Sequence, residues 1–168
     1  INARTQALES KNQELKIAYR SMSEAYMSLE HISLTDPLTN LKNRRYLASH
    51  LEKDVEMIIR RYQNWLKKAS GSPPQESDFG FYMVDIDYFK EVNDIYGHGE
   101  GDRVLVQVSE LLMSVCRESD FLVRWGGEEF LIVTRFVDRR KTEALAERIR
   151  RTMEEKLFSL SGGLTLHK

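Results

Sequence analysis

Two stretches decide the fold: residues 79–90, with the sequence FGFYMVDIDYFK, and residues 121–134, with the sequence FLVRWGGEEFLIVT. Each begins with a short apolar run of the kind that forms a buried strand. The first run ends at Asp85-Ile86-Asp87. The second is interrupted by Gly126-Gly127, a pair suited to a tight turn between antiparallel strands. The pattern predicts strands over residues 79–84, 121–125 and 129–134.

Helical periodicity surrounds these strands. Apolar residues recur on one face over about residues 43–68, 102–116 and 138–155, and a short helix is expected over residues 89–96. The order of strand, helix, helix, strand, strand, helix and a further strand from about residue 164 predicts an α+β fold. This is the split βαβ or ferredoxin-like plan of polymerase-palm domains, an antiparallel sheet backed by helices. The plan alone implies no chemistry.

A long helix is expected before this domain, because residues 1–34 contain neither Gly nor Pro. Two seam positions repeat at heptad spacing. One holds Ile1, Leu8, Leu15, Met22 and Leu29, and the other holds Arg4, Lys11, Ala18, Ala25 and Ile32. The repeat favours a parallel dimeric coiled coil over a single amphipathic helix packed on its own domain. Pro37 lacks an amide donor and disfavours helix at Asp36, so we expect a coiled-coil segment over residues 1–34 and a second domain over residues 35–168.

Composition limits the classes of protein and partner. The 168 residues are 41% hydrophobic and 30% charged, which suits one globular domain with an extension. A net charge of −1 argues against a nucleic-acid partner, and a single cysteine, Cys116, excludes an intramolecular disulfide and a multi-cysteine zinc site. No apolar run reaches the roughly 20 residues of a membrane span. The single cysteine fits a reducing compartment, and we expect a cytoplasmic domain. Because the first residue is Ile, we expect a fragment of a longer protein with an upstream sensor, and a membrane anchor in that protein stays open.

Four acids flank the predicted strand ends. Asp85 and Asp87 close the first strand, and Glu128 and Glu129 follow the two glycines. In this fold the two places come together, and carboxylates that close repel one another unless a cation lies between them. Carboxylate oxygens suit Mg²⁺ or Mn²⁺, and glycine lets a nucleotide approach the backbone. The alternative is an ordinary hairpin turn with exposed acids.

The motifs together resemble those of diguanylate cyclases, the GGDEF family, from about residue 34 to the end of the chain. The resemblance is carried, in family order and spacing, by LTDPLT (34–39), NRR (43–45), DIDYFK (85–90), ND (93–94), YGH (96–98), GD (101–102) and GGEEF (126–130). It implies that two GTP molecules condense to cyclic di-GMP and two pyrophosphates across a dimer of domains, which the coiled coil would hold together.

The resemblance also implies roles for the matching residues. Asp85 and Glu128 are the implied carboxylate metal ligands and Ile86 adds its backbone carbonyl, with two Mg²⁺ or Mn²⁺ ions in each half-site. Glu129 joins Asp85 and Glu128 in the catalytic set, supporting the metal site or proton transfer. The substrate GTP is implied to be held by Asn93 and Asp102 at the guanine, by the backbone near Tyr88, Phe89 and Lys90 at the phosphates, and in the space beside Gly126 and Gly127.

A second nucleotide site is suggested by Arg117-Glu118-Ser119-Asp120, which ends five residues before Gly126. It resembles the family's RxxD product-inhibition motif, and Arg148 on the following helix matches a secondary arginine of that site. Arginine can donate two parallel hydrogen bonds to a phosphate or a guanine edge. The alternative is a solvated charge cluster at a helix end, where arginine is favoured in any case.

Two departures from the family pattern bear on function. Asn40 stands where the family usually has Gly, a mild change because Asn also adopts left-handed geometry. The sequence stops at Lys168, before the family's next sheet strand and its later Lys and Arg at the terminal phosphates. We therefore assign the activity to the full-length protein. Two other classes stay open: a non-catalytic cyclic di-GMP receptor, and a dimerisation or signal-relay module.

Overall fold

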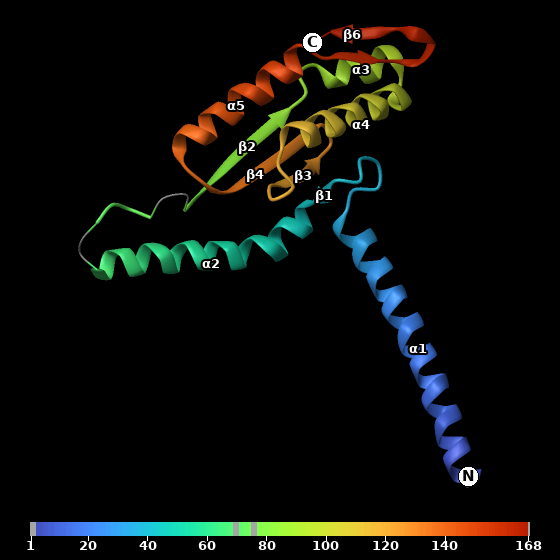
Figure 1. The fold of residues 1–168 in the computed structure, drawn as a ribbon. Helices are drawn as coiled ribbons and strands as arrows, with labels where there is room; N and C mark the ends of the chain where they lie inside the picture. Colours follow the sequence, from blue (N-terminus) through green and yellow to red (C-terminus); the bar gives the residue numbers. More distant parts are fainter. Residues whose placement is uncertain (1–2, 69–70, 75–76, 168) are drawn as a thin grey trace. The chain divides into compact units, whose positions relative to one another are not determined.

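The structure, a computed structural model, describes residues 3–68, 71–74 and 77–167 (Figure 1). It divides into two compact units, residues 1–34 and residues 35–168. The first contains α1 (Ala3–Leu34). The second contains β1 (Lys42–Asn43), α2 (Arg44–Lys68), β2 (Asp78–Asp85), α3 (Phe89–Tyr96), α4 (His98–Val115), β3 (Phe121–Gly126), β4 (Glu129–Val137), α5 (Arg139–Glu154), β5 (Leu157–Ser159), a short 3-10 helix (Ser161–Gly163) and β6 (Thr165–His167).

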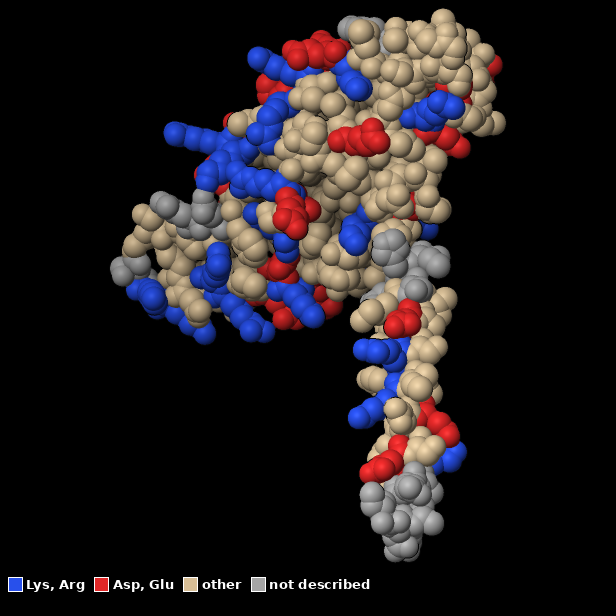
Figure 2. Space-filling view, turned by 45° about the vertical axis from the view of Figure 1, so that its right-hand side comes forward, with Lys and Arg blue, Asp and Glu red and all other residues tan. Residues whose placement is uncertain are grey.

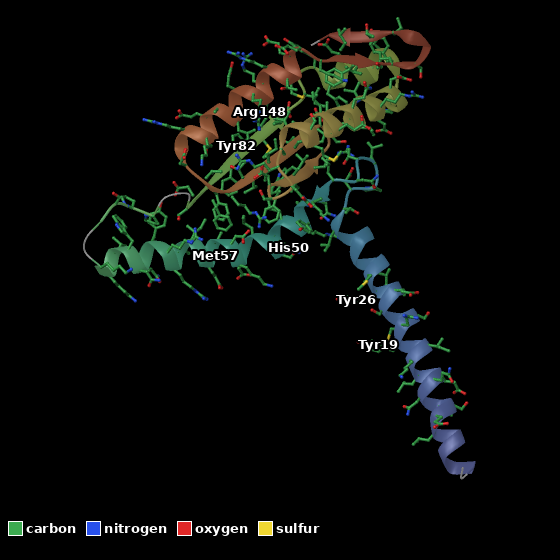
Figure 3. All side chains as sticks on the ribbon, in the orientation of Figure 1. Tyr19, Tyr26, His50, Met57, Tyr82 and Arg148 are labelled. Atoms are coloured by element: carbon green, nitrogen blue, oxygen red, sulfur yellow. The ribbon has the colours of Figure 1, made fainter. Side chains whose placement is uncertain are left out.

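The first unit is one uninterrupted helix, as the lack of Gly and Pro predicted. Four described residues of the first seam position are each 65–68% exposed in the single chain; they are Leu8, Leu15, Met22 and Leu29. Tyr19 and Tyr26, one heptad apart, are also exposed (Figure 3). Ile1 and the side chains of Arg4 and Ile32 lie outside the described residues. The dimeric coiled coil stays a prediction.

The central sheet has four strands in the order β1-β3-β4-β2. As predicted, β3 and β4 form an antiparallel hairpin, and β2 pairs antiparallel with β4. The antiparallel core of the sheet is as expected, and one parallel pair adds to it, because Lys42 and Asn43 of β1 pair in parallel with Val123 and Arg124 of β3. A strand of two residues is too short to show a period in the sequence. The sheet is therefore mixed, with β2 at one edge.

Helices cover both faces of this sheet (Figure 1). On one face, α3, α4 and α5 surround the larger core, where Val108, Leu112, Phe130 and Ile132 are fully buried. On the other face, α2 covers β3 and β4 around a smaller core made of Leu47, Phe121, Val123, Leu131 and Val133. Because both faces of β3 and β4 are buried, these strands read as nearly continuous apolar runs.

The helix α4 begins earlier than the glycines in the sequence suggested. This helix begins at His98, four residues before the predicted start at Asp102. The break between α3 and α4 falls at Gly97, whose φ of 85° favours glycine. The glycines that suggested a longer turn, Gly99 and Gly101, lie inside the helix. None of the described helices is both long and apolar enough to span a membrane.

The last predicted strand forms, but it does not join the central sheet. Instead, β6 pairs antiparallel with β5 in a separate two-stranded sheet. Gln107 of α4 holds this small sheet. Its amide nitrogen donates to the Ser159 carbonyl and its amide oxygen accepts from the Ser159 N–H, each at 2.8 Å. The predicted plan therefore holds from β2 through α5 and departs from it at the last strand.

Candidate functional site

The predicted acids gather where β2 ends and β4 begins. Asp85, the last residue of β2, pairs in register with Glu129, the first residue of β4. Residues opposed on antiparallel strands project to the same face with their Cα atoms about 5 Å apart. Glu128 precedes Glu129 in the turn, and Asp87 follows Asp85 just beyond the strand. The register thus places the end of β2 beside residues 126–129, which we call the glycine hairpin.

This group of acids is open to solvent. Asp85, Asp87 and Glu129 are exposed, and Glu128 is half-buried. Within the described residues, no Lys or Arg forms an ion pair with Asp85, Glu128 or Glu129. Like charges that face each other across two strands destabilise the sheet unless a cation neutralises them. The residues therefore fit a divalent cation.

The coordination of such a cation would be incomplete without a ligand molecule. Among the residues that the structure describes, no three His, Cys, Asp or Glu side chains are grouped closely enough to hold a metal ion. Mg²⁺ is commonly bound by one or two carboxylates together with substrate phosphates and water. Asp85 and Glu128 would hold the ion by carboxylates, and Ile86 by its carbonyl. Of the two glutamates in the hairpin, the register places Glu129, rather than Glu128, directly opposite Asp85.

The glycine hairpin leaves its backbone accessible. A Cβ atom added to Gly126 or to Gly127 would meet nothing within 4 Å. Gly127 has a φ of 53°, so the turn itself favours glycine there. Gly126 has no such conformation, and the turn does not require it. The open space at Gly126 is what a molecule approaching the backbone would use.

The loop from β2 to α3 contains the predicted phosphate-binding residues. The Ile86 carbonyl accepts a hydrogen bond from the Phe89 N–H at 3.3 Å, and a carbonyl has a second lone pair for another partner. Tyr88 has a φ of 56°, an unusual conformation for a bulky residue, and its side chain is exposed. Phe89 is buried in the core, so only its backbone can face a ligand, while Lys90 is exposed.

A cavity of about 670 Å³ runs along β2 to this loop. One wall is β2 from Phe81 to Val84, and it ends at Asp85, Ile86 and Asp87. The opposite wall comes from α5 and from Phe158. Asp85 and Asp87 therefore lie at one end of a hollow, and the register places Asp85 beside the glycine hairpin as well.

The two predicted guanine-binding residues lie close together at the junction of α3 and α4. The half-buried Asn93 side chain lies against Gly101, so closely that a Cβ atom there would collide with Asn93 Oδ1. Asp102, the next residue, is exposed. Gly101 thus lets the amide of Asn93 on α3 approach the part of α4 that carries the Asp102 carboxylate, and both groups could bond the donors and the acceptor of a guanine edge.

Asp102 also faces a cavity of about 400 Å³. The sequence did not predict the other residues that line this cavity, which are Leu38, Arg103, Val106, Gln107, Glu110 and Ser159. Leu38 belongs to the LTDPLT block, so the sequence indicated that this residue matters but not that it lines a cavity with Asp102. The others come from one face of α4 and from β5. Only the tertiary packing of β5 on α4 brings them together.

The residues predicted for product inhibition line one cavity of about 170 Å³. Arg117 and Asp120 form a closed turn, in which the Arg117 N–H donates to Asp120 Oδ2 and the Asp120 N–H donates to the Arg117 carbonyl, each at 3.0 Å. Arg148 of α5 donates to the Val115 carbonyl at 2.7 Å, which orients it toward this turn. The cavity also contains Tyr82, which lies on the α5 side of the sheet with Arg148 (Figure 3).

This cavity adds one cation that the motifs did not indicate, Lys141. Lys141 belongs to a basic cluster at the start of α5 that reads as a solvated helix end, yet it lines the same cavity as Arg117 and Arg148. In Figure 2, Lys and Arg side chains gather along the left side of the second unit, with a few Asp and Glu side chains among them. Three cations and one carboxylate suit an anionic ligand with hydrogen-bond donors, such as a guanine nucleotide.

Comparison with known proteins agrees with these observations. Residues 33–165 match the family described as "Diguanylate cyclase, GGDEF domain". The chain belongs to this family. Its GGDEF domain is 34% identical over 134 residues to Diguanylate cyclase A of Treponema denticola, which covers 80% of this chain and 33% of that protein. It is 34% identical over 128 residues to Diguanylate cyclase DosC of Escherichia coli K12, covering 76% of this chain and 25% of that protein. The chain thus spans a third or less of these relatives.

Solved GGDEF structures have the same fold. The crystal structure of the coiled coil and GGDEF domain of DgcB from Caulobacter crescentus, in complex with c-di-GMP, has a TM-score of 0.75 at 22% identity and covers 93% of this chain and 74% of that one. Diguanylate cyclase SiaD from Pseudomonas aeruginosa, in complex with its activator SiaC, has a TM-score of 0.60 at 29% identity, covering 98% and 57%. The GGDEF domain of this chain therefore has the α+β fold expected, with a mixed sheet backed by helices.

Proposed function

We propose that the full-length protein condenses two GTP molecules into cyclic di-GMP and two pyrophosphates. The observation that carries this proposal is the register of Asp85 with Glu129 beside the open glycine hairpin, since it gathers carboxylates and accessible backbone at one place. The 3′-hydroxyl of each GTP attacks the α-phosphorus of the other. Two phosphodiester bonds form, two bonds to pyrophosphate break, and the two hydroxyl protons are released.

The residues of the chain divide this task between binding and charge. Asn93 and Asp102 bind the guanine edge, and the backbone of Tyr88, Phe89 and Lys90 faces the phosphates. Asp85 and Glu128 hold divalent cations, two Mg²⁺ or Mn²⁺ ions in each half-site, which neutralise charge at the reacting phosphate when bound. Glu129 supports that site or accepts a proton.

One domain holds one GTP, so two domains must face each other. We propose that α1 pairs with α1 of a second copy, because the described apolar seam residues recur every seven residues and are exposed. Pairing raises the effective concentration of the second half-site. Replacing Leu15 and Met22 by Glu should lower specific activity most in dilute protein. Lys16→Glu, off the seam, is the matched control, and a specific activity independent of dilution in every variant would contradict this role.

The turn at Arg117 supports a second role, product inhibition. Arg117, Asp120 and Arg148 line one cavity with Lys141, which supports the binding of cyclic di-GMP there. This cavity also favours the second candidate function, a cyclic di-GMP receptor without synthesis. An upstream sensor in the full-length protein is part of this proposal.

One experiment separates enzyme from receptor. The full-length protein is incubated with GTP and Mg²⁺, and the nucleotides are separated by chromatography. We expect cyclic di-GMP and pyrophosphate in the wild type, and none above background with Asp85→Asn. The matched control is Asp78→Asn at the other end of β2, which should keep its activity. Binding of cyclic di-GMP without any product from GTP would favour the receptor.

A further inference from the structure

Arg124 bridges two segments that are far apart in the sequence. Its Nη1 donates to both carboxylate oxygens of Asp36, at 3.0 and 3.2 Å, and its Nε and Nη2 donate to the Gly127 carbonyl, at 3.1 and 2.8 Å. The side chains of Arg124 and Asp36 are only 14% and 18% exposed. Such charge-assisted bonds, shielded from water, fix geometry more strongly than surface ion pairs do.

At one end, this arginine controls the peptide that leads into the acids. The Gly127 carbonyl and the Glu128 N–H belong to the same planar peptide unit. Two donors on that carbonyl therefore fix the orientation of the peptide plane, and with it the direction in which the Glu128 Cα–Cβ bond leaves the turn. Gly127 by itself has wide conformational freedom, so the plane needs an outside restraint.

At the other end, Asp36 organises residues 35–41, which we call the proline turn. Its Oδ1 accepts from the Thr39 N–H at 2.9 Å and from the Thr39 hydroxyl at 2.7 Å, and its backbone carbonyl accepts from the Asn40 N–H. Burial acts to raise the pKa of Asp36, but the hydrogen bonds from Thr39 and Arg124 outweigh it and lower the pKa below its ordinary value. The carboxylate therefore stays charged at neutral pH. The proline turn begins directly after α1 in the sequence.

We propose that Arg124 is a positioning residue that couples the proline turn to the glycine hairpin, so that the turn sets the orientation of Glu128. This rests on the proposed function, in which Glu128 is a metal ligand. It adds a route by which the segment joining α1 to the domain can influence synthesis without any contact to substrate. Arg124 itself touches no reacting atom in this proposal.

The chain contains a matched control. Arg135, on the neighbouring strand, also forms an ion pair with an aspartate and donates to a carbonyl: its Nη1 lies 2.7 Å from Asp54 Oδ2, and its Nε donates to Ser119 at 2.7 Å. It reaches neither the proline turn nor the glycine hairpin. Loss of that pair loosens the same sheet without releasing Gly127.

Hydrogen–deuterium exchange of the full-length protein, read out by mass spectrometry, tests the coupling. Asp36→Asn keeps the shape of the side chain and leaves Arg124 in place. We expect peptides over residues 125–131 to exchange about tenfold faster in this variant, as the loss of a charged hydrogen bond implies. Asp54→Asn should leave those peptides unchanged. In the Arg124→Gln background, Asp36→Asn should add nothing further at the hairpin.

The outcome that overturns the proposal is faster exchange confined to residues 35–43, with the hairpin unchanged. If Asp36→Asn does not fold, Thr39→Val, which removes one bond to the same carboxylate, takes its place with a smaller expected change. Kinetics gives a second readout: Asp36→Asn should lower kcat about tenfold and change the KM for GTP less than about twofold. A wild type without synthesis would refute the proposed function, whereas the exchange result judges the coupling by itself.

Discussion

Arg124 and Arg135 lie on neighbouring strands and use the same chemistry at opposite ends of the β3–β4 pair. Each joins an aspartate to a backbone carbonyl, but the carbonyls differ: one belongs to Gly127 of the glycine hairpin, the other to Ser119 of the turn between Arg117 and Asp120. Arg135 also lies over the Phe121 ring, 4.5 Å from its centroid. One sheet thus presents two candidate nucleotide sites, and a separate arginine fixes each.

The difference between the two ends is one of rigidity. The Arg135 end is supported by aromatic packing and by α2, through Asp54. The Arg124 end depends on a glycine turn and on a turn that follows α1. Synthesis and product binding should therefore respond separately to changes at one end or the other.

The largest effect is expected from a crossed pair of variants. Glu128→Gln should lower synthesis about a thousandfold, because a cation at the phosphates supplies several kcal/mol of stabilisation. Arg117→Ala should leave synthesis intact and weaken inhibition by cyclic di-GMP about tenfold or more. Initial rates with and without added product measure both. Equal loss of synthesis and inhibition in either variant would show that the two ends are one site.

The second change breaks the rigid end. Arg135→Gln removes an ion pair, a carbonyl donor and a cation over an aromatic ring, so we expect the free energy of unfolding to fall by about 1–3 kcal/mol. Inhibition by cyclic di-GMP should weaken with it, because the Ser119 carbonyl loses its donor. Urea denaturation gives the first value and a product-inhibition curve the second. A stability equal to wild type would mean that Arg135 is not the support we describe.

The third change separates substrate affinity from fold stability, which neither arginine does. Gly101→Ala would push the Asn93 amide aside, since the added Cβ meets Asn93 Oδ1. We expect the KM for GTP to rise about tenfold, while the helix propensity that Ala adds, up to about 1 kcal/mol, offsets part of the cost of crowding Asn93 and the buried Phe89 ring. Steady-state kinetics and a thermal melt provide the comparison. An unchanged KM would remove Asn93 from the guanine site.

The smallest effect is a pH dependence at the Arg124 end. Because the pKa of Asp36 is lowered in the folded protein, its stabilisation is fully present above the ordinary carboxyl pKa of about 4 and is lost as the pH falls through the folded value. Wild type should exceed Asp36→Asn by about 1 kcal/mol between pH 5 and 8, and the difference should shrink below about pH 4. A difference that grows on acidification would contradict the charged carboxylate.

Much of the fold could be predicted from local pattern. The apolar runs around Gly126-Gly127 gave β3 and β4, and 3.6-residue periodicity gave α2 and α5 within a residue of their bounds. The parallel pairing of β1 could not be predicted, because Lys42 and Asn43 are polar and their partner is about 80 residues away in the sequence. The start of α4 was missed because two glycines inside the helix resembled a turn.

The candidate site was predictable in its residue types but not in its contacts. Motif order led to Asp85, Glu128 and Asn93, and the chemistry of carboxylates suggested a cation. Which acid faces which strand is a matter of register, and register depends on side-chain packing along the whole of β2 and β4. The bonds from Arg124 to Asp36 leave no local trace in the sequence, because they join residues 88 positions apart.

Cys116 lends itself to experiments on α1. It is half-buried, and burial together with the neighbouring Asp120 raises the pKa of its thiol to about 11, despite the opposing effect of Arg148. Near pH 8 only about one molecule in a thousand carries the thiolate that attacks labels and disulfides. A cysteine placed at Met22 would then outcompete the native one in oxidative cross-linking. The yield of linked chains would report how closely two such helices approach in the intact protein.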